Sequence, residues 1–209
     1  MSRTSAAVSR AFTYDLERLF VDQDRDWVIE TIAPVLAWVP GETRPMKPPP
    51  FRFEVDHTTS AATTKITIDL GWDEATLERL VPGVTDHARR LRAGRSAQRE
   101  HVTELAAYGL TFVAISTLMP GRRVVAMQQG AAPDILFDAT PGALRGVEAA
   151  GRTTGGRTAL AVIRNGQASR RASGALGKAQ QLLARTDLAE VHLSLWCGAP
   201  RVATLEQLR

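Results

Sequence analysis

The longest apolar stretch of the chain constrains its fold most strongly. It runs for 16 residues from Leu105 to Pro120, which is shorter than the roughly 20 apolar residues that a membrane-spanning helix needs. The range Ser96–Leu118 predicts a long helix, polar at its start and apolar at its end, which Pro120 and Gly121 stop. An apolar helix of this length is typical of a buried core helix, and we expect no membrane span.

The segments after this helix alternate between strand and helix patterns. Strands are predicted over Arg122–Gln128, Pro133–Ala139, Leu144–Ala150 and Ala189–Cys197. A helix rich in Ala, Leu, Gln and Lys is predicted over Ala172–Arg185, and a short helix near Leu205 and Leu208. Ala159–Ile163 follows a Gly/Thr/Arg loop and is left unassigned. The order α-β-β-β-α-β predicts an α/β (α+β) fold with one mixed central sheet flanked by helices.

The first 94 residues are predicted to form an N-terminal α+β extension. An approximate boundary at Gly94 separates this extension from a core over residues 95–209. Its predicted helices are Ala11–Leu19, a second one that Asp26 could cap, and Trp72–Val81. Its predicted strands are Phe51–Val55 and Lys65–Leu70. The range 40–50 contains three consecutive prolines and is predicted to be a linker.

The charge distribution and the cysteine content limit the partners, metal sites and cellular compartment that this chain is expected to have. Residues 1–94 carry 12 basic and 14 acidic side chains, whereas residues 95–209 carry 14 basic and 8 acidic ones. A basic C-terminal half is compatible with a nucleic-acid or phosphate partner, and also with solubility alone. The single cysteine, Cys197, excludes an internal disulfide and a Cys-rich zinc site. With no apolar signal segment over residues 1–12, these features predict a cytoplasmic protein.

Two carboxylates come together if the turn at Pro141 joins the second and third strands of the core. Asp134 then lies directly opposite Glu148, with Cβ atoms about 4.5–5.5 Å apart, and Asp138 and Arg152 share their face. Opposed carboxylates repel each other. One of them therefore pairs with a cation or takes a proton, or both of them bind a metal. Such a pair suits Mg²⁺, whereas a solvated polar sheet face is the plainer alternative.

These residues resemble the restriction-endonuclease-like, or PD-(D/E)xK, nuclease superfamily. The matching residues are Pro133-Asp134, Glu148 fourteen positions on, and Glu104 in the preceding helix, together with the α-β-β-β-α-β order. The resemblance implies a Mg²⁺- or Mn²⁺-dependent nuclease in which Asp134, Glu148 and Glu104 hold the metal. It covers about half of the chain.

The sequence departs from the family at the strand lysine, which is expected two residues after Glu148 and is Ala150 here. Arg152 lies on the same strand face and offers charge, but it does not deprotonate. Lys178, in the following helix, is the only lysine of this half and a candidate substitute. Both are therefore candidate catalytic residues. A decayed site, kept for binding, is the alternative.

A phosphate-loop motif overlaps this region. Residues 151–158 match G-x-x-x-x-G-K-[ST] with Arg157 in place of lysine. The segment beyond it is interrupted by Asn165-Gly166, and too few residues follow for a nucleoside-triphosphatase core. A basic loop that touches a nucleic-acid backbone is the favoured interpretation, with contacts from Arg157, Arg164, Arg170 and Arg171.

Two functions remain open at this point. The first is a divergent metal-dependent nuclease that hydrolyses phosphodiesters, in defence or nucleic-acid processing. The second is a catalytically inactive protein of the same fold that serves as an interaction or assembly subunit, with a protein partner or a second copy of itself.

Overall fold

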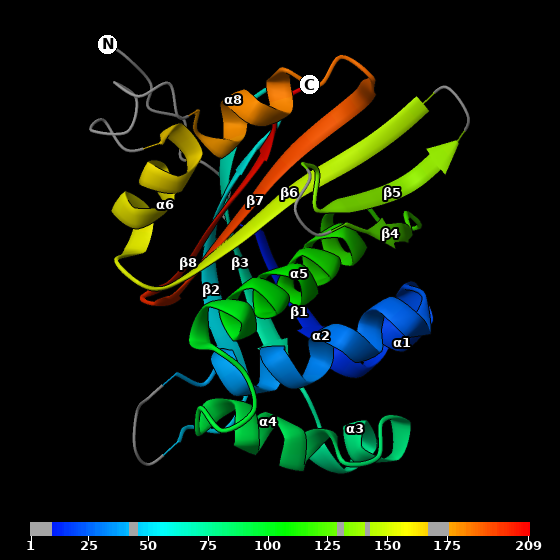
Figure 1. Ribbon diagram of the computed structural model, residues 1–209, viewed down its shortest axis with the longest axis vertical. Coiled ribbons are helices and arrows are strands. Elements are labelled where there is room, and N and C mark those ends of the chain that lie inside the picture. Colours follow the sequence, from blue (N-terminus) through cyan, green and yellow to red (C-terminus); the bar gives the residue numbers. More distant parts are fainter. Residues whose placement is uncertain (1–9, 42–45, 129–131, 141–142, 167–175) are drawn as a thin grey trace.

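One mixed eight-stranded sheet, in the order β1-β3-β2-β8-β7-β6-β5-β4, organises the protein (Figure 1). The computed structural model describes residues 10–41, 46–128, 132–140, 143–166 and 176–209. The strands are β1 (Arg10–Asp15), β2 (Phe51–Thr58), β3 (Thr63–Gly71), β4 (Val124–Met127), β5 (Ile135–Thr140), β6 (Ala143–Thr154), β7 (Leu188–Ala199) and β8 (Arg201–Gln207). The helices are η1 (Leu16–Arg18), α1 (Leu19–Asp22), α2 (Arg25–Trp38), α3 (Glu74–Leu80), α4 (Val84–Arg92), α5 (Arg99–Leu118), α6 (Gly156–Asn165) and α8 (Lys178–Leu183).

Helices cover both faces of this sheet, as expected for an α/β fold. The larger apolar cluster joins α2 and α5 to one face and includes Phe53, Phe112 and Trp196. The smaller cluster joins α6 and α8 to the other face and includes Leu160 and Leu182. Strand alternation places neighbouring residues of β7 and β6 in opposite clusters, so each face of the sheet packs against its own helices.

The predicted order of the second half is confirmed. The long helix is α5, the three strands are β4, β5 and β6, and the last strand is β7, with Val191, Leu193, Leu195 and Cys197 buried together. The predicted helix over Ala172–Arg185 is described as α8, and residues 172–175 lie outside the described part. Ala159–Ile163 belongs to a second crossover helix, α6.

Two predicted helices are wrong, for the same physical reason. Ala11–Leu19 begins as β1, which pairs in parallel with β3, and only Leu16–Asp22 forms short helical turns. The C-terminal segment is not a helix but β8, which lies between β2 and β7. In both segments, backbone pairing with strands distant in sequence outweighs a weak local helical pattern.

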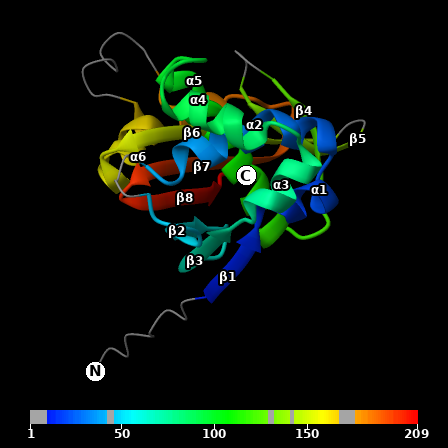
Figure 2. The ribbon, with the colours of Figure 1, turned by 90° about the horizontal axis from the view of Figure 1, so that it is seen from below.

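Strand β8 joins the two halves of the chain. It pairs in parallel with β2 of the first half and antiparallel with β7 of the second half. The larger apolar cluster likewise takes residues from both sides of Gly94. Figure 2 shows the strong twist of the sheet, with β1 directed across the line of β7 and β8. Of the helices that the structure describes, none has the length and apolarity to cross a membrane.

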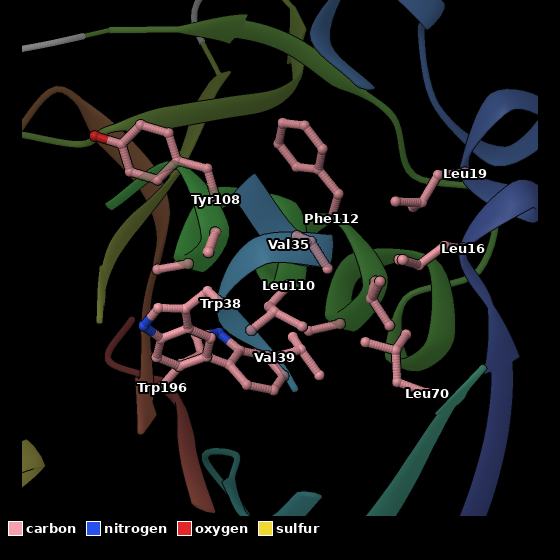
Figure 3. Close-up of a cluster of buried hydrophobic side chains, with 14 of the residues drawn as sticks. Leu16, Leu19, Val35, Trp38, Val39, Leu70, Tyr108, Leu110, Phe112 and Trp196 are labelled. Carbon is pink, nitrogen blue, oxygen red and sulfur yellow. The ribbon is translucent and has the colours of Figure 1, made fainter. Parts of the chain in front are cut away.

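Helices α2 and α5 approach closely at a glycine. A Cβ atom added at Gly109 would lie 2.6 Å from Val35 Cγ2 and 3.1 Å from Thr31 Cβ. The absence of a side chain at this position therefore allows the two helices to touch. Figure 3 shows the buried cluster around them, with Val35 beside Leu110 and Phe112.

We expect Gly109→Ala to destabilise the fold although alanine favours a helix. The added methyl group overpacks the α2–α5 contact, at a cost of about 1–3 kcal/mol, against a helix-propensity gain of about 1 kcal/mol. Urea unfolding of Gly109→Ala, Val35→Ala and the double variant measures the coupling. The penalty of Gly109→Ala should shrink in the Val35→Ala background; additive effects would show that the two helices do not touch there.

Candidate functional site

The pairing of β5 with β6 brings Asp134 and Glu148 together. The observed partners Ile135↔Val147 and Leu136↔Gly146 have the predicted register. Asp134 directly precedes β5, so the same register places it across from Glu148. Both residues are buried, at 7% and 3% exposure. The predicted juxtaposition of the two carboxylates is therefore confirmed.

Lys178, at the first position of α8, reaches this pair from the crossover connection. Its ammonium group contacts Glu148 Oε1 and lies 3.7 Å from Asp134 Oδ2. The lysine side chain is 31% exposed, whereas the carboxylate side chains are 10% or less. The three charges thus form one cluster that opens to solvent on the lysine side.

Two glycines allow these groups to approach. A Cβ at Gly146 would lie 2.4 Å from Pro133 Cγ, so the residue before Asp134 packs directly over the β6 backbone. A Cβ at Gly177 would lie 2.3–2.5 Å from the backbone around Asn165 at the end of α6. The first contact positions Asp134, and the second positions the start of α8 and hence Lys178.

Burial and charge shape the protonation of this cluster. Burial and the nearby charge of Glu148 raise the pKa of Asp134 to about 6, although Lys178 and hydrogen bonds from Ala149 N and Tyr108 oppose the rise. The Ala149 N–H donates to Asp134 Oδ2 at 2.9 Å. Burial lowers the pKa of Lys178, but the charges of Asp134 and Glu148 outweigh it and hold the pKa above its usual value. Lys178 is therefore a cation at neutral pH.

One oxygen of the cluster is buried without a partner. Glu148 Oε1 contacts Lys178, but Oε2 has no hydrogen-bond partner among the described residues. A buried carboxylate oxygen left unpaired costs free energy, and such an atom calls for a bound ion, a water molecule or a ligand. Glu148 Oε2 is therefore an acceptor that no group in the described part of the chain uses.

Tyr108 is a member of this site that the sequence did not indicate. It lies on α5 with its side chain buried, and its hydroxyl donates to Glu104 Oε1 at 3.0 Å. Burial and the charge of Asp134 raise the pKa of this phenol above its usual range. The available signal was the four-residue spacing of Glu104 and Tyr108, which places both on one helix face.

The three predicted metal ligands do not converge as a set. In the ranges that the structure describes, no three His, Cys, Asp or Glu side chains are grouped closely enough to hold an ion. Asp134 and Glu148 form a pair, and Glu104 stands apart with a side chain that is 47% exposed. Its charge still acts on Lys178, whose pKa it helps to raise.

Arg152 is exposed and lies on the strand face of Glu148, beside Cys197 of β7. It lies four positions beyond Glu148, which is about 13 Å along the strand. Asp138 was expected to share this face, and that prediction is wrong. A register shift follows Phe137, and Asp138 instead accepts from Arg123 N at 2.9 Å.

Two of the arginines predicted to bind nucleic acid are engaged within the chain. Arg157 donates to Asp56 at 2.6 Å, and Arg164 makes a two-point contact with Glu206, with both distances 2.6 Å. These pairs attach α6 to β2 and β8. Arg170 and Arg171 lie outside the described residues.

The phosphate-loop alternative does not fit the geometry. The strand β6 continues through Thr154, so the first half of the motif pairs with β7 and forms no loop. A sustained helix, α6, does follow, contrary to expectation. However, the residue in the lysine position, Arg157, is paired with Asp56.

A polar cavity of about 250 Å³ lies on the face of the sheet that α5 covers. His192 Nε2 contacts Glu190 Oε1 at 2.7 Å, and Glu190 also pairs with Arg122 and Arg145. The Ser194 hydroxyl is held by Thr111 and Trp196. Because these contacts already engage the carboxylate and the serine, the Asp134–Glu148–Lys178 cluster is the better candidate for chemistry.

Comparisons with protein-family models, curated proteins and solved structures found no match to this chain. Function is therefore inferred from the geometry of the site.

We expect Lys178→Met to destabilise the protein most at alkaline pH. Without the ammonium, two buried carboxylates face each other, which costs about 1–3 kcal/mol and raises their folded-state pKa values. A folded state that holds these protons more tightly loses stability as pH rises through those values. The difference from wild type should therefore be largest near pH 8 and shrink towards pH 5.

Urea unfolding across this pH range measures the effect. Lys65→Met is the matched control, because Lys65 is an exposed lysine of β3. An equal and pH-independent change in both variants would show that Lys178 does not compensate the carboxylates.

Proposed function

We propose that this protein is a divergent metal-dependent nuclease of the restriction-endonuclease-like type, in which Lys178 replaces the missing strand lysine. The observation that carries the proposal is the position of the Lys178 ammonium, in contact with Glu148 and 3.7 Å from Asp134. In this proposal, a lysine from the crossover helix takes the role that the family assigns to a lysine at position 150. Nucleic acid is the partner that this chemistry requires.

The residues present fit a divalent cation such as Mg²⁺ or Mn²⁺. Asp134 and Glu148 would hold it, and the buried, unpartnered Glu148 Oε2 supports this assignment. Hard cations of this class bind one or two protein carboxylates and complete their shell with water and substrate phosphate. Glu104, which stands apart, would act through water. When bound, the cation would polarise the scissile phosphate and an attacking water.

The protein groups have distinct tasks in this proposal. The Ala149 N–H orients Asp134, and the pleat of β6 directs Glu148 towards α8. Lys178 stands where its ammonium can donate to a phosphate oxygen held between the two carboxylates, and it stabilises the negative charge that develops there. Arg152, about 13 Å along the strand from Glu148, is assigned to the path of the nucleic-acid backbone.

Metal binding and nucleic-acid cleavage test this proposal directly. We expect wild-type protein to bind Mn²⁺ by calorimetry and to cleave DNA or RNA in its presence. Glu148→Gln should abolish cleavage because it removes a carboxylate from the metal site. Lys178→Met should lower the cleavage rate by two or more orders of magnitude while retaining Mn²⁺ binding.

Ala150→Lys and Lys65→Met complete this experiment. Lys65→Met should cleave as wild type does. If only Ala150→Lys cleaves, the site is a decayed one and the protein is an interaction or assembly subunit. Cleavage that survives Lys178→Met but not Glu148→Gln would reject the catalytic role of the lysine.

The salt dependence of nucleic-acid binding tests the role assigned to Arg152. Arg152→Glu should weaken binding and lower the slope of log affinity against log salt by about one, because the arginine is exposed. Arg164→Gln should leave the slope unchanged and reduce stability, because Arg164 is paired with Glu206. Fluorescence anisotropy with a labelled oligonucleotide, from low to moderate salt, measures both; an unchanged slope for Arg152→Glu would exclude it from the interface.

A further inference from the structure

The buried hydroxyl of Tyr108 binds a carboxylate at the edge of the site. It donates to Glu104 Oε1 at 3.0 Å, one turn earlier on α5. Figure 3 shows the ring at the edge of the apolar cluster, with its hydroxyl directed away from the cluster and towards the yellow-green strands.

The tyrosine is held in a fixed orientation. Its side chain is 1% exposed and belongs to the apolar cluster between α5 and the sheet. The hydroxyl of this buried ring is the donor in the hydrogen bond to Glu104 Oε1.

Glu104 depends on this donor for its position. Its side chain is 47% exposed, and its other contact is a 3.9 Å approach to His101, which is itself 49% exposed. An exposed glutamate on a helix samples several rotamers, and a hydrogen bond from a buried phenol selects one of them. In that rotamer its charge acts on Lys178.

We propose that Tyr108 is a positioning residue that orients Glu104 towards a divalent cation held by the Asp134–Glu148 pair. This inference rests on the proposed function, because it concerns the same cation. Tyr108 itself does not touch the reacting atoms. Its role is to convert a mobile surface carboxylate into a fixed outer ligand, and such outer partners typically affect metal affinity by 10–100-fold.

The test is a double-mutant cycle read by Mn²⁺ affinity. Calorimetric titration with Mn²⁺ alone compares wild type, Tyr108→Phe, Glu104→Gln and the double variant. Tyr108→Phe and Glu104→Gln should each raise the dissociation constant about tenfold. The double variant should be little worse than either single variant, because both remove one shared arrangement.

The chain offers a matched control in Tyr14. Its side chain is also buried, and its hydroxyl donates to a carboxylate, Asp22, at 2.7 Å. Tyr14→Phe removes the same hydroxyl at a place unconnected to the cluster. It should lower the melting temperature about as much as Tyr108→Phe, but leave the Mn²⁺ dissociation constant within about twofold of wild type.

The outcomes separate this inference from the proposed function. If wild type binds Mn²⁺, Glu148→Gln abolishes binding and Tyr108→Phe binds as wild type does, the positioning role is wrong and the nuclease proposal stands. Strictly multiplicative effects would show that Tyr108 does not act through Glu104. If wild type neither binds Mn²⁺ nor cleaves, both proposals fall.

Discussion

A carboxylate buried within a sheet requires compensation, and the second half of this protein is arranged around one such group. Glu148 projects from β6 towards α8 and is 3% exposed. An isolated buried charge is strongly unfavourable, so a cation must reach it. Lys178 supplies that cation from a helix thirty residues further along the chain. The β6–α6–α8–β7 crossover thus both connects two parallel strands and delivers the counter-charge.

The same cluster retains unused binding capacity. One lysine faces two carboxylates, so the charge is not fully balanced, and Glu148 Oε2 has no partner in the described part of the chain. The pKa of Asp134 is raised to about 6, because burial and the charge of Glu148 both disfavour its ionised form. A purely structural ion pair would be expected to satisfy its oxygens more completely. This imbalance, more than the presence of acidic residues, favours a site for a cation and a phosphate.

The two halves of the chain are interdependent through β8. Because β8 lies between β2 and β7, the N-terminal strands extend the sheet that carries the site. The glycine contact between α2 and α5 fixes the helix that bears Tyr108 and Glu104. Substitutions in this helix contact, such as Gly109→Ala, are therefore expected to affect the site through the position of α5.

The sequence by itself determined the elements around the site and the β5–β6 register. A strand alternates its side chains with a period of two, so the turn at Pro141 was enough to place Asp134 opposite Glu148. The apolar run at Leu105–Leu118 likewise required a buried helix. Other features depend on contacts between distant parts of the chain. Only the crossover geometry shows that Lys178 reaches Glu148, and only the packing of α5 shows that Tyr108 is buried while its hydroxyl binds Glu104. Strands β1 and β8 escaped prediction because their stability comes from partners distant in sequence, which a local pattern does not encode.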